Sequence, residues 1–567
     1  MPPVYPDETD DGSSTSNTGV LSDSSGPSAQ SMAQQTTAKR PPISPREYVE
    51  AIVFHSKQTI QDTLYPGDVF EDLGLYLKKG VQSFRPPNNI QGTLHTIDKV
   101  AGRSLDIYSN ASQCAQKLDE DKNSRRCQII FLNGYPSPQW ISTIGALCRT
   151  DPQYFNTHLR FRCRRGYYST PTLRSGLENI ITLRFVTLGS REDRFGQCDQ
   201  DQVDALRLGG ERDMGKYEHD LMVGNGLEAG DSIVRSFSVL DDKNFFIEQE
   251  MSICLHKYEE GWIILVTIDA GSDLSKGPQG PWLTQEDRHS PSPWTIFAPT
   301  IQHNPKVWMR SNPAKPATST KFQERFPQSA QLLAQYCGEA LDTQTMVLDP
   351  FYAITDLFQF CAFSEIQFMN VMEAKIKEDT DHISLMKKSP TLSNLLYCQE
   401  IVQKHLTRLQ ETVRIIKCSG GPLWPHVEKG HPRQYQKATR AKDRLLEDYE
   451  QLVERAEVIL ERCSKGMDVI MNNVMLAESK RAILQAQSVV KLTLIAFFYI
   501  PLSFTCSFFS MDIVGFEQGI SRIWLWFAVS VPVLLISISF LFLDRQKLKA
   551  IWLSIKSVGV DPGKSGN

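Results

Sequence analysis

The sequence predicts an α+β cytoplasmic domain with an antiparallel sheet, a long stalk helix and a two-helix transmembrane hairpin. Three observations lead to this fold class. Short β-branched and aromatic runs alternate with turn residues over positions 127–270, which indicates strands. Positions 434–511 hold only one proline and one glycine among good helix formers, which favours one long helix. Two charge-free apolar runs lie near the C-terminal end.

Composition excludes several classes of function. The 567 residues carry a net charge of -4 and no basic patch with interleaved aromatics, so we expect no nucleic-acid partner. The twelve cysteines are spread singly, which leaves neither a paired-cysteine metal site nor a disulfide framework. We find no glycine-rich phosphate loop and no nucleophile motif. We therefore expect no enzyme and no bound cofactor.

The cytoplasmic part divides into four segments. Positions 1–44 are rich in Ser, Thr, Asp, Gln and Pro, so we expect a disordered tail without a signal peptide. An α/β domain follows over 45–270, then a Pro/Gly-rich loop over 271–320 and a helical region over 321–431. The predicted strands are 128–132, 180–188, 232–240, 245–256 and 262–268, and the predicted helices in the α/β domain are 140–148 and 152–159.

The stalk is predicted over 432–491 as part of one unbroken helix. An α-helix of about 78 residues is about 117 Å long, so most of it projects from a bilayer. Apolar or small residues recur every three or four positions, and we expect neighbouring copies to bury this seam. Two helices broken near Gly466 are the alternative. The seam consists of Leu445, Tyr449, Leu452, Ala456, Ile459 and Cys463.

The two apolar runs cover 492–511 and 523–543 and contain 20 and 21 residues. Each is long enough to cross the ~30 Å hydrocarbon core, and a pair of buried core helices is the alternative. The loop 512–522 is short, and most Lys and Arg lie outside the hairpin, so both termini, including the basic tail 544–567, are predicted to be cytoplasmic. The flanking basic residues are Lys480, Arg481, Lys491, Arg545, Lys547, Lys549 and Lys556.

One stripe of the first predicted span is free of aromatic residues. At about 100° per residue its members share a face, aliphatic near the cytosol and hydroxylated near the outside. Either the small residues allow close helix packing, or the stripe lines a narrow ion path. Pro501 leaves a backbone carbonyl unpaired, which favours a path. The stripe consists of Val489, Leu492, Ala496, Ile500, Ser503 and Ser507.

The end of this span resembles a known family. The segments Tyr499-Ile500-Pro501-Leu502-Ser503-Phe504 and Phe508-Phe509-Ser510-Met511-Asp512 are similar to the end of the first membrane helix in CorA-like divalent-cation channels. The similarity is specific over 432–549. Over 127–270 it is looser and resembles large eukaryotic, fungal-type members, through Pro138-Gln139-Trp140 and 151–159.

The resemblance implies a homopentamer whose first membrane helix lines a pore for magnesium or zinc. The family's Gly-Met-Asn signature, which holds the hydrated cation, corresponds here to Ser510, Met511 and Asp512, so only the methionine is kept. Glu517 is the acidic residue expected in the outer loop. The leading hypothesis is thus a divalent metal-ion channel or transporter with lipid and further copies as partners. The alternative is a non-conducting signalling or scaffold protein anchored by the hairpin.

Two weaker candidates for metal binding lie in the cytoplasmic part. Cys418, His426 and His431 have the right side chains but irregular loop spacing, so exposed loop residues are the favoured interpretation. An acidic run can sense a cation between subunits, although a solvated helix end is the simpler interpretation. The run consists of Glu373, Glu378, Asp379 and Asp381.

Overall fold

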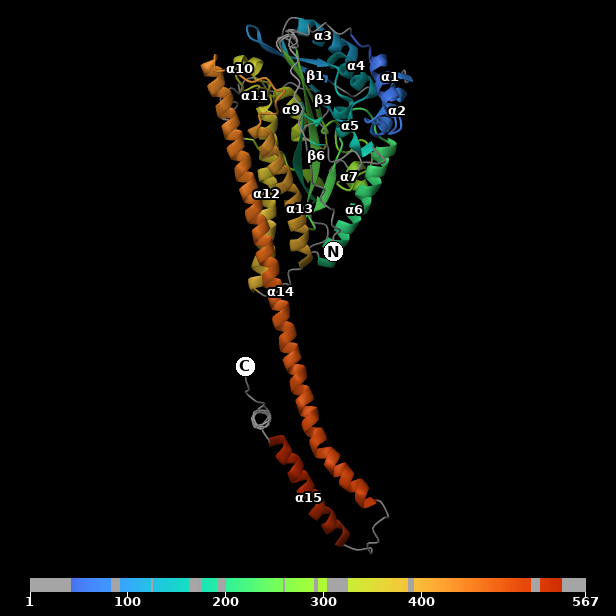
Figure 1. Ribbon diagram of the computed structural model, residues 1–567, viewed down its shortest axis with the longest axis vertical. Coiled ribbons are helices and arrows are strands. Elements are labelled where there is room, and N and C mark those ends of the chain that lie inside the picture. Colours follow the sequence, from blue (N-terminus) through green and yellow to red (C-terminus); the bar gives the residue numbers. More distant parts are fainter. Residues whose placement is uncertain are drawn as a thin grey trace, which may run out of the picture.

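The computed structural model describes residues 42–82, 92–123, 126–162, 173, 176–191, 200–258, 261–289, 294–302, 325–385, 392–510 and 521–542. A mixed α+β domain lies at one end, and the helix α14 (Pro432–Ser510) projects far beyond it (Figure 1). A further helix, α15 (Ser521–Phe542), runs back beside the distal end of α14. Positions 1–41 of the predicted tail, most of the predicted outer loop and the basic tail lie outside the described residues.

One eight-stranded sheet forms the centre of the domain, in the order β2-β1-β3-β7-β6-β4-β8 with β5 paired to β6. The strands are β1 (Gly92–Asp98), β2 (Gly102–Tyr108), β3 (Cys127–Asn133), β4 (Ile180–Arg191), β5 (Ser236–Val239), β6 (Asn244–Lys257), β7 (Trp262–Ile268) and β8 (Thr295–Phe297).

The prediction of an antiparallel sheet is wrong at one position, because β3 and β7 run parallel, from Gln128 opposite Ile263 to Asn133 opposite Ile268. Parallel neighbours require a long crossover, and here the crossover includes helices and three other strands. Local patterns report strands but not which distant strands pair. Strands β1, β2 and β8 are missing from the predicted set, since β2 is a half-exposed edge strand and β8 is a short strand in the Pro/Gly-rich segment.

Two hydrophobic cores cover the two faces of the sheet. One lies under α1 (Pro45–His55), α2 (Glu71–Gln82), α3 (Ala111–Asn123), α4 (Pro138–Cys148) and α5 (Pro152–His158). Local signals begin these helices: Ser44 caps α1 in a reciprocal capping box, and Ser137 and Asp151 cap α4 and α5 ahead of a proline. The other core lies under α12 (Thr355–Leu385), α13 (Leu392–Lys417) and the first half of α14 (Figure 1).

The remaining helices connect these layers. They are α6 (Gln200–Val223), α7 (Gln285–His289), α9 (Leu333–Tyr336), α10 (Thr343–Leu348) and α11 (Pro350–Ala353). Helix α7 and strand β8 lie inside the predicted loop 271–320, so that segment is not structureless throughout its described part. Thr284, Trp294 and Thr295 all donate backbone N–H bonds to Asp287, which holds this segment in shape.

The apolar seam of α14 is buried within its own chain, which corrects the expectation that neighbouring copies cover it. Its members are at most 3% exposed and pack against α12 and α13. The Tyr449 hydroxyl also donates to the Phe358 carbonyl of α12 at 3.0 Å. A repeat of apolar residues shows that a helix has a buried side, but not whether the covering helices belong to the same chain.

The helix is unbroken at Gly466, in agreement with the prediction of a single helix. The glycine serves packing instead. A Cβ atom there would lie 2.9 Å from Leu395 Cδ1 and 3.1 Å from Thr380 Cγ2, closer than ordinary contacts. Gly466 therefore lets α13 and α12 approach α14 where it leaves the domain.

Candidate pore-lining face of the long helix

Charged contacts hold the first half of α14 against the domain. Glu373 of α12 accepts from Arg455 at 2.7 Å and from Arg462 at 2.6 Å, and bonding to Arg455 contributes most to lowering the pKa of Glu373. Asp379 is 6% exposed and pairs with Lys375 at 3.3 Å, and burial raises the pKa of Asp379. The interpretation of this acidic run as a solvated helix end is thus wrong for Asp379, whereas Glu378 is 60% exposed and Glu373 is 30% exposed and paired with α14. The side chain of Asp381 lies outside the description.

Beyond Gly466 the helix loses its cover. Every side chain from 471 to 490 is exposed. Large apolar side chains are among them, including Met475 at 58%, Ile483 at 55% and Leu484 at 62%. An uncovered apolar helix surface of this kind is typical of a contact with a partner.

The distal part of α14 is the one helix of the described chain that is long and apolar enough to cross a membrane. In α15 the apolar stretch Trp524–Ser539 is shorter, so the second span remains a prediction. The two helices touch through buried hydroxyl groups, since Ser530 donates to Thr505 at 3.1 Å and both are at most 4% exposed. Thr505 therefore marks the side of α14 that α15 covers.

The predicted stripe lies on the other side of α14. At about 100° per residue, its six members fall between about 140° and 220° around the helix from Thr505. Val489, Leu492 and Ile500 are 59%, 66% and 65% exposed, Ser503 and Ser507 are exposed, and Ala496 is half-buried. The α15 helix thus leaves this face open.

The phenylalanines occupy different positions around the same helix. Phe504, Phe508 and Phe509 form a run of ring contacts, with centroids 6.4 Å and 5.8 Å apart in successive pairs. By the same spacing, Phe504 and Phe508 lie between the α15 side and the open face, and Phe509 lies on the α15 side. The six members of the stripe therefore carry aliphatic, small and hydroxyl groups without a ring, and the nearest exposed ring is Tyr499, 71% exposed and about 20° beyond the edge of the stripe.

Serine hydroxyls give this face its polarity, and Pro501 leaves one carbonyl of the same helix without its usual donor. The Ser503 hydroxyl donates to the Ile500 carbonyl at 3.0 Å and retains its oxygen lone pairs as acceptors. Pro501 lies inside the helix and has no N–H, so the carbonyl four residues earlier, at Phe497, lacks its helical partner. Oxygen acceptors are the groups that hydrated divalent cations need.

The predicted mouth is described only at its first residue. Ser510 is the last residue of α14 and is exposed, whereas Met511, Asp512 and Glu517 lie outside the described residues. Among the residues that the structure places, no three His, Cys, Asp or Glu side chains gather closely enough to hold a metal ion.

The loop candidate for metal binding is not assembled either. Cys418 is exposed, and His426 is 45% exposed with its Nδ1 atom 3.9 Å from Asp349 Oδ2. These residues form an exposed loop, in agreement with the favoured interpretation.

A buried ionic chain behind α14 was not identified from the sequence. His405 of α13 lies between Glu365 of α12 at 2.7 Å and Glu248 of β6 at 3.1 Å, and Arg408 binds Glu248 at 2.7 Å. Burial opposes the charged form, but Glu365 and Glu248 outweigh it and raise the pKa of His405 to about 9. The available sequence signal was a polar residue, His405, on the apolar side of an amphipathic helix.

This chain continues across the sheet. Arg184 of β4 lies 3.2 Å from Glu248 and 3.2 Å from Glu250, and Arg160 binds Glu250 at 2.7 Å. Burial opposes ionisation of Glu250, but Arg235 and the other arginines lower its pKa to about 2. The ionic chain thus links the sheet to the helices that hold α14.

Comparisons with known proteins add little. No family model matches the chain, and no curated protein is similar to it in sequence. Among solved structures, the CorA magnesium transporter from Methanocaldococcus jannaschii is similar to it at 11% identity and a TM-score of 0.28, over 63% of this chain and 96% of that one. A TM-score this low does not by itself establish a shared fold or function.

Proposed function

We propose that the chain forms a homo-oligomeric channel for divalent metal ions, with α14 of each copy lining the pore. The observation that carries the proposal is the open face of α14, from Val489 to Ser507, which lies opposite the side covered by α15. Helices arranged in a ring with α15 outside turn this face toward the axis. It has the aliphatic and hydroxylated surface that a narrow path for a hydrated ion requires.

The order of groups along the face suggests how such a pore works. Val489, Leu492 and Ile500 form the aliphatic constriction, which stops ions when it is dry and passes them when it is wetted. Ser503 and Ser507 provide oxygen atoms on the outer side. The constriction controls passage, and the oxygen atoms replace contacts with bulk water.

The mouth of the proposed pore is formed by Ser510, Met511 and Asp512, with Glu517 in the outer loop. Carboxylates converging at one opening concentrate divalent cations through their summed field. Magnesium or zinc is the ion class that the family resemblance implies. Both termini lie on the cytosolic side in this proposal.

The oligomer is supported by the second half of α14. The side chains of 471–490 are exposed in the single chain, and a lone helix with apolar groups around it gains from a partner. A pentamer is the number that the family resemblance implies. The first half of α14 packs against α12 and α13 of the same chain. Each copy therefore enters the proposed oligomer with its domain and the first half of α14 already packed together.

Thiol labelling during ion flux tests the pore face. The full chain with Cys506 replaced by serine is placed in liposomes with a magnesium- or zinc-sensitive dye inside. We expect a small charged thiol reagent added outside to modify Ser503→Cys and Ser507→Cys and to block flux. Phe504→Cys is the matched control, because it lies one residue away but off the face, and it should leave flux unchanged.

Two results would overturn this function. If the thiol reagent blocks ion flux equally in Ser503→Cys and Phe504→Cys, the open face of α14 does not line the pore. No flux of any divalent cation from well-folded protein would favour the non-conducting scaffold, which the replacement of the family's Gly and Asn by Ser510 and Asp512 also favours.

A further inference from the structure

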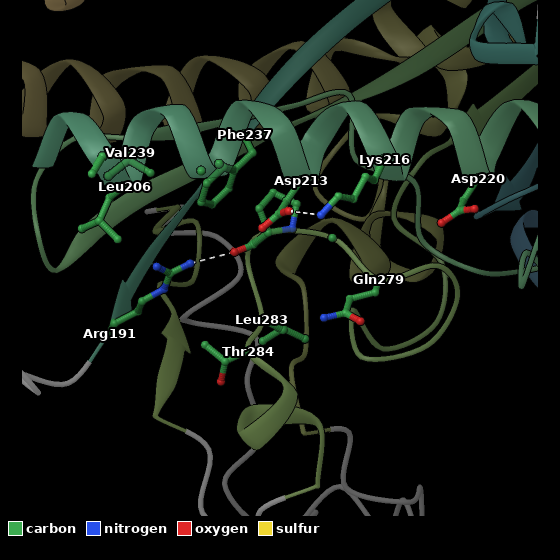
Figure 2. Close-up of a pocket in the computed structure, with 15 residues that line it drawn as sticks. Arg191, Leu206, Asp213, Lys216, Asp220, Phe237, Val239, Gln279, Leu283 and Thr284 are labelled. Carbon is green, nitrogen blue, oxygen red and sulfur yellow. Dashed lines mark hydrogen bonds and ion pairs between the residues drawn. The ribbon is translucent and has the colours of Figure 1, made fainter. Parts of the chain in front are cut away.

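A cavity of about 580 Å³ lies far from α14, between α6, β5, the end of β4 and the loop 279–284 (Figure 2). This volume is in the range of small-molecule sites, about 300–1,000 Å³. Arg191 lies at one end of the cavity, and Asp213, Lys216 and Asp220 of α6 follow toward the other end. The cavity thus has a cationic end and a largely acidic end.

Arg191 is the feature that points to a ligand. Its Nη2 atom donates to the Pro281 carbonyl at 2.7 Å, and its guanidinium lies 4.9 Å from the ring centre of Phe245, while its Nε atom is buried without a hydrogen-bond partner. Burial lowers the pKa of Arg191, with the charge of Asp287 acting in the opposite direction. Arg191 as a residue is half-buried. A partly desolvated cation without a contacting carboxylate is costly, and an anion in the cavity lowers this cost.

Two other arginines of the described chain, which bind carboxylates, show the contrast. Arg235 binds Asp269 at 2.7 Å, and Arg160 binds Glu250 at 2.7 Å. For Arg191 the described residues provide a carbonyl and two aromatic rings, but no carboxylate within ion-pair distance. Its planar fork suits a carboxylate or phosphate head group.

The wall formed by α6 carries two adjacent glycines with different surroundings. Gly210 is required by packing, because a Cβ atom there would lie 2.9 Å from Phe237 Cε1. Gly209 lines the cavity, and a Cβ atom added to it would meet no other atom within 4 Å. Glycine within a helix costs about 1 kcal/mol relative to alanine, so nothing in the packing accounts for Gly209, and its effect is to widen the cavity.

The acidic end offers acceptors to a ligand. Lys216 pairs with Asp213 at 2.9 Å, and both side chains are more than half exposed, so this pair is free to rearrange. Asp220 lies further along α6, at the end of the row away from Arg191 in Figure 2, and its Oδ1 atom accepts from Asn225 Nδ2 at 3.2 Å. Hydroxyl groups of a ligand are suitable donors to these carboxylates.

We propose that this cavity binds a small hydroxylated organic anion, with its phosphate or carboxylate head on Arg191 and its hydroxyl groups toward Asp213 and Asp220. Such a site places a metabolite sensor on the cytoplasmic domain. It does not depend on ion conduction, so it stands whether the chain is a channel or a scaffold.

Calorimetric titration of the detergent-solubilised full chain tests the site with four probes: ribose 5-phosphate, gluconate, ribose and inorganic phosphate. We expect ribose 5-phosphate or gluconate to bind at least tenfold more tightly than ribose or inorganic phosphate, and the stronger of the two identifies the head group. Binding of inorganic phosphate alone would reduce the site to simple anion attraction and overturn the proposal, as would no binding of any probe at 10 mM.

Variants locate the binding. Gly209→Leu fills the cavity and favours the helix, so it should fold and abolish binding. Gly215→Leu is the matched control, because it also has open space around a Cβ atom on α6 but does not line the cavity. Arg191→Met should weaken binding at least tenfold. Equal affinity of the two leucine variants would place the ligand elsewhere and contradict the proposal.

Discussion

At the scale of single residues, His405 is the clearest case of a side chain whose charge state affects the stability of the fold. The His405 side chain is 3% exposed and contacts Glu248 and Glu365 directly. Arg408 and Arg184 bind the same Glu248. These residues line a small cavity together with Tyr449 of α14. A histidine held charged in this way stabilises the folded chain only while it is protonated. The junction between sheet and helices therefore depends on pH.

The pH dependence follows from the raised pKa. Because His405 titrates at about 9 when folded and near 6.5 when unfolded, its contribution is complete below pH 6.5 and is lost as pH rises through 9. The loss is on the order of 3 kcal/mol. Thermal unfolding of the full chain should show a lower melting temperature at pH 9.5 than at pH 6.5, with a smaller change for His405→Gln.

A second buried histidine provides the control. Burial, assisted by Arg103, lowers the pKa of His95 to about 4, so its neutral form stabilises the fold above pH 6.5 and the contribution is lost on acidification. His95→Asn should show the same drop in melting temperature between pH 6.5 and pH 9.5 as the wild type. It should change the pH dependence of the melting temperature only below pH 6.5. The same alkaline slope in wild type and His405→Gln would contradict the assignment.

Asp512 is the other residue with a specific prediction. Asp512→Asn introduces the residue that the CorA-like channels carry in their signature and removes up to one charge per copy at the mouth of the proposed pore. We expect weaker retention of zinc, by about tenfold, and a shift toward magnesium, because a converging field of like charges concentrates divalent ions. Asp512→Ala should reduce flux further. Zinc and magnesium flux into liposomes is measured for the wild type, Asp512→Asn and Asp512→Ala at matched protein content. Identical flux in these three proteins would show that Asp512 does not select ions.

At the scale of elements, α14 has two halves with different surroundings. The first half is buried against α12 and α13 of the same chain, and the second half is exposed between the domain and the apolar segment. Gly466 lies at the change from one to the other. Stability of the first half should therefore be a property of each single chain.

Paired substitutions on adjacent residues test this. Ile459 is 1% exposed and Val458 is 42% exposed on the same turn of α14. Ile459→Ala should cost about 2–5 kcal/mol through lost burial and a cavity. Val458→Ala should cost about 0.5 kcal/mol or less, as at other surface sites. The difference in unfolding free energy between Ile459→Ala and Val458→Ala should persist when the protein is diluted tenfold in detergent. If that difference disappears on dilution, the residues that cover Ile459 belong to another copy.

At the scale of the whole molecule, the domain and α14 form one continuous unit. The ionic chain from His405 to Arg160 joins the sheet to α13, one of the helices that pack against α14. A pore requires several such units around one axis. The exposed side chains of 471–490 are the surface through which they meet in the proposed assembly.

Native mass measurement in lipid nanodiscs tests the assembly. We expect a cyclic oligomer of five copies. Replacing Met475 and Ile483 together by lysine should shift the mass toward the monomer, because charges then face the partner helices. Replacing Glu461 and Lys465, which pair on the surface of the first half, by alanine is the control and should leave the mass unchanged. A monomer in the wild type would remove the basis for a central pore.

The sequence by itself determined the elements whose signals are local. Five strands, two short helices, the long helix and the apolar run that ends it were all predicted, because periodicity, β-branched or aromatic runs and missing prolines act within a few neighbours. The shared face of Val489, Leu492, Ile500 and Ser503 also follows from helix spacing alone.

Tertiary structure decided everything that depends on which distant segments meet. It paired β3 with β7 in parallel, placed the seam of α14 against its own α12 and α13, and brought His405 between Glu248 and Glu365. It also placed Arg191 at a cavity, with no carboxylate of the described chain within ion-pair distance of its guanidinium. A local pattern specifies that a side is apolar or that a charge needs a partner. The choice among partners depends on burial and electrostatics summed over the whole packed chain.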